Sequence, residues 1–354
     1  MANVDVGAVI AAHDGGPEWE GRDKAFFQNR RGSKTWFRRW APKAGNKAMA
    51  MLFIVHGLHS HGGRWAQVAH YYTAKDYLVF AHDHVGHGLT AQADEGTSGV
   101  VDDFTKMTDD FTEFVENMVD DQEDKTLPVF ILGHSMGSAV ATLATKNCLE
   151  KPGLGRRIKK LALTGCPLVP GPAAASPLGM RFLFPLTKNT GLMRGAAWML
   201  ASISPKGYAA PIDKAALSKD PEVEMEAAVD PLMVKGSMRN ITAYEIIRMM
   251  QAVRDNAHKI TVPTLIMHGA DDQIAYLSGS EQLRDMLTGC GDVRMEVYPG
   301  VLHEVLRHRE HFQGAMAVLD QHWTKFSTPR CYNFSTLPAP YPPIPPVPHG
   351  RMTD

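Results

Sequence analysis

One stretch of the chain guides the interpretation of all the rest, and it reads Leu127-Pro128-Val129-Phe130-Ile131-Leu132-Gly133-His134-Ser135-Met136-Gly137. Its first half is a short apolar run that predicts a buried strand. Its second half matches the pattern G-x-S-x-G, in which a serine lies on a tight turn between a strand and a helix. Glycine suits both flanks, because larger side chains there would collide with the neighbouring strand and helix. An alanine-rich, helix-prone run over 138–149 follows, so we expect a strand, an exposed serine and a helix in succession.

Outward from this stretch, similar apolar runs that end abruptly at turn residues recur along the chain. Their length predicts further buried strands, over 48–55, 77–81, 158–164, 263–267 and 293–298. Apolar residues at helical spacing predict helices between them, over 104–119, 244–257 and 312–326. Strands that alternate with helices indicate an α/β fold, with a mostly parallel central sheet covered by helices on both faces.

Two segments do not follow this alternation. Residues 167–240 carry no strand signal, begin with a proline-rich stretch and then become unusually apolar over 178–200. We interpret this segment as an insertion between two strands of the sheet. The segment 327–354 is rich in proline, which can neither continue a helix nor pair in a sheet, so we expect an extended or disordered tail. A ligand for a proline-recognising domain is the alternative interpretation of the tail.

Composition and charge exclude several classes of protein. Hydrophobic residues make up 44% and charged residues 21% of the chain, with a formal net charge of -1, as in ordinary globular proteins that bind no nucleic acid. The four cysteines are scattered, which favours reduced thiols inside the cell; they are Cys148, Cys166, Cys290 and Cys331. Residues 1–16 do not have the pattern of a signal peptide. No apolar run is long enough to span a bilayer, so we expect a cytoplasmic protein whose membrane contact, if any, is peripheral.

Ser135 needs two partners to act as a nucleophile. A histidine must take the proton of its hydroxyl, and a carboxylate must orient that histidine. In folds with this turn the acid and then the histidine follow the serine along the chain, each after a strand. The expected strand 263–267 leads to Asp271 and Asp272, and the strand 293–298 leads to His303. Order and placement fit both acids, although each site alone could also be a strand end or a surface loop.

The negative charge that develops on the carbonyl oxygen during such an attack needs backbone N–H donors. One donor is expected from the residue after the nucleophile, Met136, and the other from the loop after an early strand. That loop covers 56–65, and Leu58 is its natural candidate. A glycine-rich turn without any catalytic role is the alternative for this loop.

A second stretch, His82-Asp83-His84-Val85-Gly86-His87, suggests a different class of enzyme. Closely spaced histidines after a strand could bind zinc, as in metallo-hydrolases with an H-x-H-x-D-H motif. Here Gly86 stands where that motif needs its aspartate, and we identify no further ligands. We therefore expect a polar turn that supports the site and assign no metal ligand, with the metallo-hydrolase kept as an alternative.

With these residues assembled, the chain resembles monoacylglycerol lipases, in the lysophospholipase-like branch of the α/β-hydrolases. The resemblance covers about residues 25–325, and the shared stretches are 80–88, 127–137, 211–213 and 230–232. It implies an α/β-hydrolase fold with a mobile helical cap inserted after the sixth strand. The domains expected from it are an N-terminal extension, a core in two pieces, the cap and the tail, at 1–24, 25–166 with 241–326, 167–240 and 327–354.

The resemblance also assigns roles to single residues. Family members have G-x-x-D at the acid, which selects Asp272 over Asp271. Ser135, Asp272 and His303 are then the catalytic residues, and the backbone N–H groups of Leu58 and Met136 form the oxyanion hole. The implied reaction cleaves a monoacylglycerol into fatty acid and glycerol, without any cofactor.

The loop 56–65 matches the family's H-G-x-G-E-H-S-x-R-Y only in part. His59 and Ser60 replace glycine and glutamate, whereas His61 and Arg64 match and are candidates for substrate contacts. A lysophospholipase, a general carboxylesterase and a serine aminopeptidase are the related alternatives. A non-catalytic lipid-binding protein is a more distant alternative, because such a protein would be expected to have lost one of the three catalytic residues.

The family cap presents apolar helices to the bilayer and forms a channel for the acyl chain, and the insertion has the residues for both. Large apolar side chains crowd it, and basic side chains among them could meet phosphate head groups. The apolar residues are Leu178, Met180, Phe182, Leu183, Phe184, Leu186, Leu192, Met193, Trp198, Met199 and Leu200, and the basic ones are Arg181, Lys188 and Arg194. Packing of the cap onto the core is the alternative role of these apolar residues. We expect a peripheral membrane contact through the cap, together with a lipid ester substrate.

Overall fold

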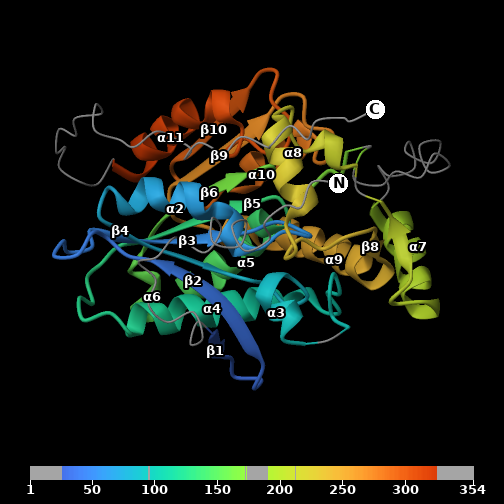
Figure 1. Cartoon of the computed structure of the whole chain (residues 1–354), viewed down its shortest axis with the longest axis horizontal. Helices are drawn as coiled ribbons and strands as arrows, with labels where there is room; N and C mark the ends of the chain where they lie inside the picture. Colours follow the sequence, from blue (N-terminus) through green and yellow to red (C-terminus); the bar gives the residue numbers. More distant parts are fainter. Residues whose placement is uncertain (1–25, 95, 172, 174–189, 212, 325–354) are drawn as a thin grey trace, which may run out of the picture.

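The protein is built around one large twisted sheet (Figure 1). The computed structural model describes residues 26–94, 96–171, 173, 190–211 and 213–324. In these residues the strands of the sheet lie in the order β1-β2-β4-β3-β5-β6-β9-β10; β2 pairs antiparallel with both β1 and β4, and the strands from β4 to β10 pair parallel. The strands are β1 (Phe26–Gln28), β2 (Lys34–Trp40), β3 (Ala50–Val55), β4 (Tyr77–His82), β5 (Val129–His134), β6 (Ile158–Thr164), β9 (Thr264–Gly269) and β10 (Val293–Tyr298).

All the strands expected in the core are confirmed, and two more were missed. The pattern of β2, Lys-Thr-Trp-Phe-Arg-Arg-Trp, carries no apolar run because Arg38 and Arg39 lie within it. Arg38 is nevertheless fully buried, since its Nη1 donates to Asp83 Oδ1 at 2.8 Å. A buried charge is tolerated when it is paired and hydrogen-bonded, and that partner is 45 residues away in the sequence.

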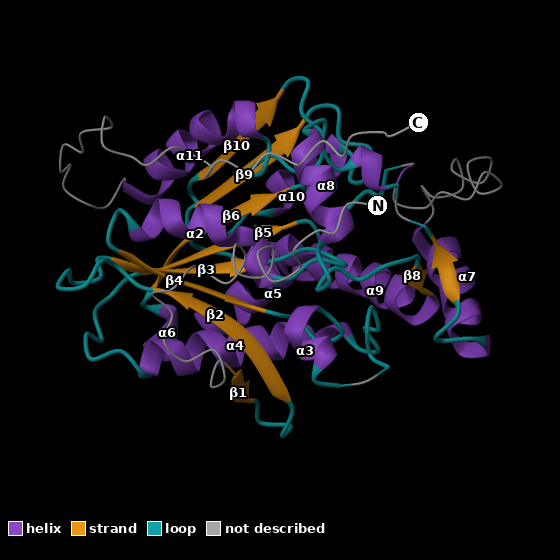
Figure 2. Ribbon diagram, viewed as in Figure 1, coloured by secondary structure: helices purple, strands orange, loops and turns teal. Residues whose placement is uncertain are grey.

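Helices cover both faces of the sheet (Figure 2). Successive side chains of a strand point to opposite faces, and β3 shows the result. Met51, Phe53 and Val55 join a core with α4, α5 and α9, whereas Leu52 and Ile54 join a core with α2 and α11. The helices are α2 (Ala66–Thr73), α3 (Gly88–Gln92), α4 (Phe104–Asp120), α5 (Met136–Leu149), α6 (Pro152–Gly155), α9 (Asn240–Asn256), α10 (Leu277–Met286) and α11 (Arg309–Thr324), with short 3₁₀ turns η2 (Gly62–Trp65) and η6 (Ala257–Lys259).

The segment between β6 and β9 forms an insertion, as expected after the sixth strand. It contains α7 (Thr190–Ile203), η5 (Lys214–Ala216) and α8 (Pro221–Val229), and α7 packs against α9. Our expectation that it holds no strand was wrong, because β7 (Tyr208–Ala210) pairs antiparallel with β8 (Met238–Arg239). Strands of two or three residues are too short to show a periodicity in the sequence. Figure 2 shows α7 and β8 on the side towards which the parallel strands run.

Several expectations concern residues outside those that the structure describes. They include the extension 1–24, the tail 327–354 and the apolar cap residues from Leu178 to Leu186, together with Arg181 and Lys188. The proposed domain boundaries stay predictions. In α/β sheets ligands bind beyond the carboxyl ends of the strands, so the residues that follow β5, β9 and β10 are the place to look for a functional site.

Candidate active site

The turn that carries Ser135 lies between β5, which ends at His134, and α5, which begins at Met136. Its backbone angles, φ 54° and ψ -127°, lie in a region that side chains other than glycine rarely adopt. Such strain persists only where the surroundings enforce it. The flanking glycines show how: a Cβ at Gly137 would lie 2.2 Å from Val55 O, and one at Gly133 would lie 2.6 Å from Gly137 O. The close packing of three backbone segments therefore requires the glycines and presents the serine.

His303 and Asp272 meet at the same edge of the sheet, after β10 and β9. His303 Nδ1 lies 2.6 Å from Asp272 Oδ2, and both side chains are buried. The other carboxylate oxygen of Asp272 accepts hydrogen bonds from the backbone N–H groups of Ile274 and Ala275, at 2.8 and 2.9 Å. Asp271, in contrast, forms a half-exposed ion pair with Lys219 at 2.9 Å. The geometry thus joins His303 to Asp272 and leaves Asp271 at the surface.

The charges around this pair lower the pKa of Asp272 and raise the pKa of His303. Burial alone would raise the pKa of Asp272, but His303 and His268 outweigh it and lower that pKa well below the usual range. Burial alone would lower the pKa of His303, but Asp272, and to a smaller degree Glu304, raise it above 6.5. Nδ1 of His303 faces Asp272, whereas its buried Nε2 has no hydrogen-bond partner in the part of the chain that the structure describes. That nitrogen is available to take a proton.

Two backbone N–H groups near Ser135 are also unengaged. A Cβ at Gly57 would lie only 3.0 Å from Ser135 Cβ, so the loop that carries Leu58 runs directly beside the serine. Met136 is the first residue of α5, where backbone N–H groups have no partner within the helix. Among the described residues, neither the N–H of Leu58 nor that of Met136 has an acceptor.

Gly165, the residue after β6, was missed in the sequence although the site depends on it. Its φ is +58°, and a Cβ there would lie 2.9 Å from His303 Cε1. Any side chain at this position would push the imidazole away. An isolated glycine at the end of a predicted strand does not reveal which ring approaches it.

The two candidates for substrate contact are buried in the structure. His61 Nε2 lies 2.7 Å from Asp230 Oδ2, which follows α8 and so connects the insertion to the loop after β3. Arg64 Nη1 lies 3.9 Å from Glu304 Oε1, and the guanidinium is almost inaccessible. Neither partner was identified from the sequence. A contact of His61 or Arg64 with substrate stays a prediction.

The stretch His82–His87 forms a buried turn. Asp83 is its centre, because it pairs with Arg38 and accepts hydrogen bonds from the N–H groups of Gly62 and Leu89 at 2.7 and 2.8 Å. Burial lowers the pKa of His82 and of His87 to about 4, so both are neutral. The expectation of a supporting polar turn agrees with these contacts.

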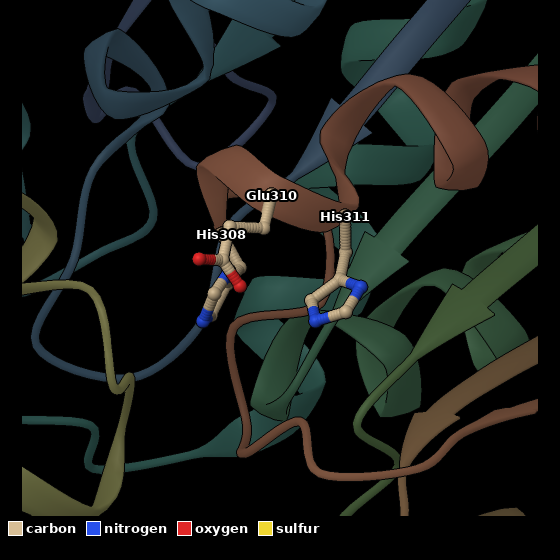
Figure 3. Close-up of side chains that lie close together, drawn as sticks. All are labelled: His308, Glu310 and His311. Atoms are coloured by element: carbon tan, nitrogen blue, oxygen red, sulfur yellow. The ribbon is translucent and has the colours of Figure 1, made fainter.

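These histidines do not form a cluster of metal ligands in the described residues. The group of three donor side chains with ligand atoms within 4.8 Å of one another is a different one, His308, Glu310 and His311 (Figure 3). It lies at the beginning of α11, and Glu310 is exposed to solvent. The described part of the chain therefore offers the metallo-hydrolase alternative no ligand set at the turn 82–87.

Comparisons with known proteins agree with the fold. The family described as Serine aminopeptidase, S33 (Hydrolase_4) matches residues 46–310. A monoglyceride lipase of Homo sapiens is 31% identical over 290 residues, which cover 82% of this chain and 85% of that protein. A monoacylglycerol lipase of Mycolicibacterium smegmatis is 29% identical over 271 residues, which cover 77% of this chain and 86% of that protein.

A solved structure shares the fold. A soluble variant of the monoglyceride lipase of Saccharomyces cerevisiae, in complex with a substrate analog, superposes with a TM-score of 0.70 at 21% identity, over 88% of this chain and 97% of that one. In the described residues, no helix is both long and apolar enough to cross a membrane. The chain therefore belongs to the α/β-hydrolase family described as serine aminopeptidase, S33, together with the monoglyceride lipases that it resembles.

Proposed function

We propose that this protein is a serine hydrolase that cleaves the ester bond of monoacylglycerols to give free fatty acid and glycerol. One observation carries the chemistry: the contact of 2.6 Å between His303 and Asp272, at the same sheet edge as the strained turn of Ser135. The substrate class rests on the monoglyceride lipases among the relatives, which match over most of their length.

In the proposed reaction Ser135 Oγ attacks the carbonyl carbon of the ester while His303 Nε2 takes the hydroxyl proton. Asp272 accepts the hydrogen bond from Nδ1–H, which keeps the lone pair of the imidazole on Nε2 and stabilises the imidazolium that forms. The N–H groups of Leu58 and Met136 stabilise the oxyanion, because both lie beside Ser135 and have no other acceptor in the described residues.

The attack gives a tetrahedral intermediate. When this intermediate collapses, the ester bond breaks and His303 gives its proton to the leaving glycerol oxygen. The acyl group remains on Ser135 Oγ. A water molecule then attacks the acyl-enzyme, with His303 again taking one proton, and the fatty acid leaves as the serine recovers its hydrogen. Every proton that His303 takes is returned, so the cycle needs no metal or organic cofactor.

The family description favours a second candidate, a serine aminopeptidase. Such an enzyme must bind the charged amine of its substrate with a free carboxylate. Glu304 is the carboxylate next to His303, but it is buried between Arg64 and Arg307, at 3.9 and 3.6 Å. Its charge is already balanced, which makes an amine subsite there unfavourable and supports the ester substrate. Hydrolysis of aminoacyl anilides that is faster than hydrolysis of monoacylglycerols would reverse this choice.

The first experiment combines a fluorophosphonate probe with release of fatty acid from a monoacylglycerol. We expect labelling and release by the wild-type chain, and loss of both in Ser135→Ala, with an unchanged circular dichroism spectrum. Labelling without release would keep the serine hydrolase and discard the glyceride substrate. Comparison with a lysophospholipid under the same conditions separates a monoacylglycerol lipase from a lysophospholipase.

We also propose that the insertion contacts a membrane surface, in a protein located in the cytoplasm. α7 exposes an apolar group to solvent: Trp198 at 57%, Met199 at 52%, Leu200 at 47% and Ile203 at 76%. Tyr208 in β7 is also 62% exposed. Arg194 lies on α7 with the apolar residues. Large apolar side chains with a basic residue among them are typical of segments that lie in the interface of a bilayer.

A further inference from the structure

A cluster of charged side chains, most of them buried, lies next to the candidate active site. It consists of Glu304, Arg64, Arg307 and Glu226, and we call it the Glu304 cluster. Glu304 Oε1 lies 3.9 Å from Arg64 Nη1, and Glu304 Oε2 lies 3.6 Å from Arg307 Nε. Arg307 Nη2 also pairs with Glu226 Oε2 of α8, at 2.6 Å. Two guanidinium groups and two carboxylates therefore balance one another; Glu304, Arg64 and Arg307 are buried, whereas the side chain of Glu226 is 27% exposed.

The contacts of Glu304 with the two arginines are longer than ordinary hydrogen bonds. Among the described residues, Glu304 Oε2, Arg307 Nε and two nitrogens of Arg64 are buried without a hydrogen-bond partner. Burial alone would raise the pKa of Glu304, but His134, Arg64 and Arg307 together lower it to about 2, so the carboxylate is ionised. Its charge acts through space on whatever lies nearby, because the low polarity of the interior screens it weakly.

The charge of Glu304 acts on the imidazole of His303 in two ways. Glu304 is the next residue in the chain, and its charge contributes to the raised pKa of His303. The second way is through the ring of His134, which lies close to both. Nε2 of His134 is 3.7 Å from Glu304 Oε2, and the ring centroids of His134 and His303 are 4.9 Å apart. Thr164 Oγ1 holds the other nitrogen of His134 at 2.8 Å.

The direction in which Glu304 shifts the pKa of His303 follows from the charges around that imidazole. Asp272 and Glu304 are the carboxylates that raise its pKa, whereas the neighbouring His134 is neutral because burial lowers the pKa of that ring to about 4. Arg64 and Arg307 stand behind Glu304. Their positive charges therefore offset part of the negative charge that Glu304 presents to the imidazole.

We propose that Glu304 is a positioning residue of this hydrolase: its buried carboxylate stabilises the imidazolium of His303 and holds the ring of His134 against it. This inference rests on the function proposed above, in which His303 becomes positively charged while Ser135 attacks. A fixed negative charge near a site where positive charge develops lowers the barrier without any reorganisation at the moment of reaction.

The test is the pH dependence of kcat/KM for Glu304→Gln with a short-chain nitrophenyl ester. The base must be unprotonated to act, so activity is lost as the pH falls through the pKa of His303. Removal of the charge lowers that pKa, and we expect the acid limb to move down by about one pH unit. The same loss destabilises the imidazolium in the transition state, so kcat should fall about tenfold. An acid limb at its wild-type position in folded Glu304→Gln contradicts the inference.

Matched variants separate this role from a structural one. Glu226→Gln removes the other carboxylate of the Glu304 cluster, and we expect a similar loss of thermal stability with no displacement of the acid limb. Glu304→Asp keeps the charge and should restore most of the wild-type profile. A displacement in Glu226→Gln as large as in Glu304→Gln would assign the effect to packing of the cluster and overturn the inference.

A further variant covers the case in which Glu304→Gln does not fold. Arg307→Gln removes a positive charge and should move the acid limb in the opposite direction, to higher pH. An unchanged limb in this variant also overturns the inference. Failure of the proposed function looks different, because the wild-type chain would then hydrolyse no ester, or Ser135→Ala would hydrolyse it equally well.

Discussion

The sheet core and helix α7 use apolar residues in opposite ways. Every residue of β3, β4 and β5 is buried, and Phe53 at the centre packs against Phe80, Phe111 and Phe114 at ring distances of 5.1–6.3 Å. From Arg194 to Ile203 in α7, Ala201 is the one buried residue, while Trp198 and Ile203 face solvent. Burial therefore explains the apolar residues of the core, whereas most of those of α7 are not buried by any of the described residues. The predictions below test this division.

The largest effect should come from the polar residues at the strand ends. Asp272→Asn would leave the fold intact but let the imidazole of His303 adopt the wrong tautomer, so we expect kcat to fall by about 10³–10⁴-fold. Asp271→Asn is the matched control, because its partner Lys219 lies at the surface and surface ion pairs contribute little. Steady-state hydrolysis of one ester by both variants gives the comparison. Equal losses would refute the assignment of Asp272.

The second prediction compares how substitutions in the core and in α7 change the free energy of unfolding. Phe53→Ala removes a fully buried ring, so the free energy of unfolding should fall by about 3–5 kcal/mol. Trp198→Ala removes a ring of similar size that is 57% exposed, and the change should stay within about 0.5 kcal/mol. Urea denaturation curves for the two variants measure both values. A costly Trp198→Ala would mean that this side chain packs the insertion onto the core.

The pH dependence of the wild-type chain is the third expectation. Burial would lower the pKa of His303, but Asp272 and Glu304 raise it above 6.5. The active form has an unprotonated imidazole, so kcat/KM should fall about tenfold for each pH unit below that pKa. A profile of kcat/KM against pH should therefore have its acid limb above pH 6.5, and a limb clearly below 6.5 would show that the two carboxylates do not control this base.

The last prediction concerns membrane binding through the exposed apolar residues of α7. We expect these substitutions to change stability and activity least. The double variant Trp198→Ser, Ile203→Ser should float with phosphatidylcholine vesicles less than the wild-type chain, because it loses apolar area that enters the interface. Val297→Ser removes an exposed apolar side chain of β10, 41% exposed, and should float like the wild type. Vesicles with added anionic lipid then test the contribution of Arg194. Flotation that is the same in all three proteins would remove α7 from the proposal.

The local parts of the site were predictable, and the reasons are local. Gly133, Ser135 and Gly137 form a pattern because the turn excludes side chains at fixed offsets. His303 and the aspartates stand out because each follows a short apolar run. The choice of Asp272 over Asp271 came from a family resemblance, and the contact with His303 agrees with that choice.

The parts that were missed depend on residues that are distant in the sequence. Arg38 lies in a strand that its own sequence does not indicate, and only the pairing with Asp83 explains it. His61 and Asp230 are 169 residues apart, and no pattern links them. Gly165 and Glu304 follow expected strands without any sign that both act on His303.

By itself, then, the sequence determined the parallel strands of the core, several helices between them, the turn at Ser135 and the chain order of the catalytic candidates, because periodicity, sterics and turn chemistry act over a few residues. The tertiary structure decided which carboxylate meets His303, which charges surround it and which apolar side chains remain exposed. These depend on distances between segments that come together only when the sheet forms, and electrostatic effects fall off with distance in space rather than along the chain.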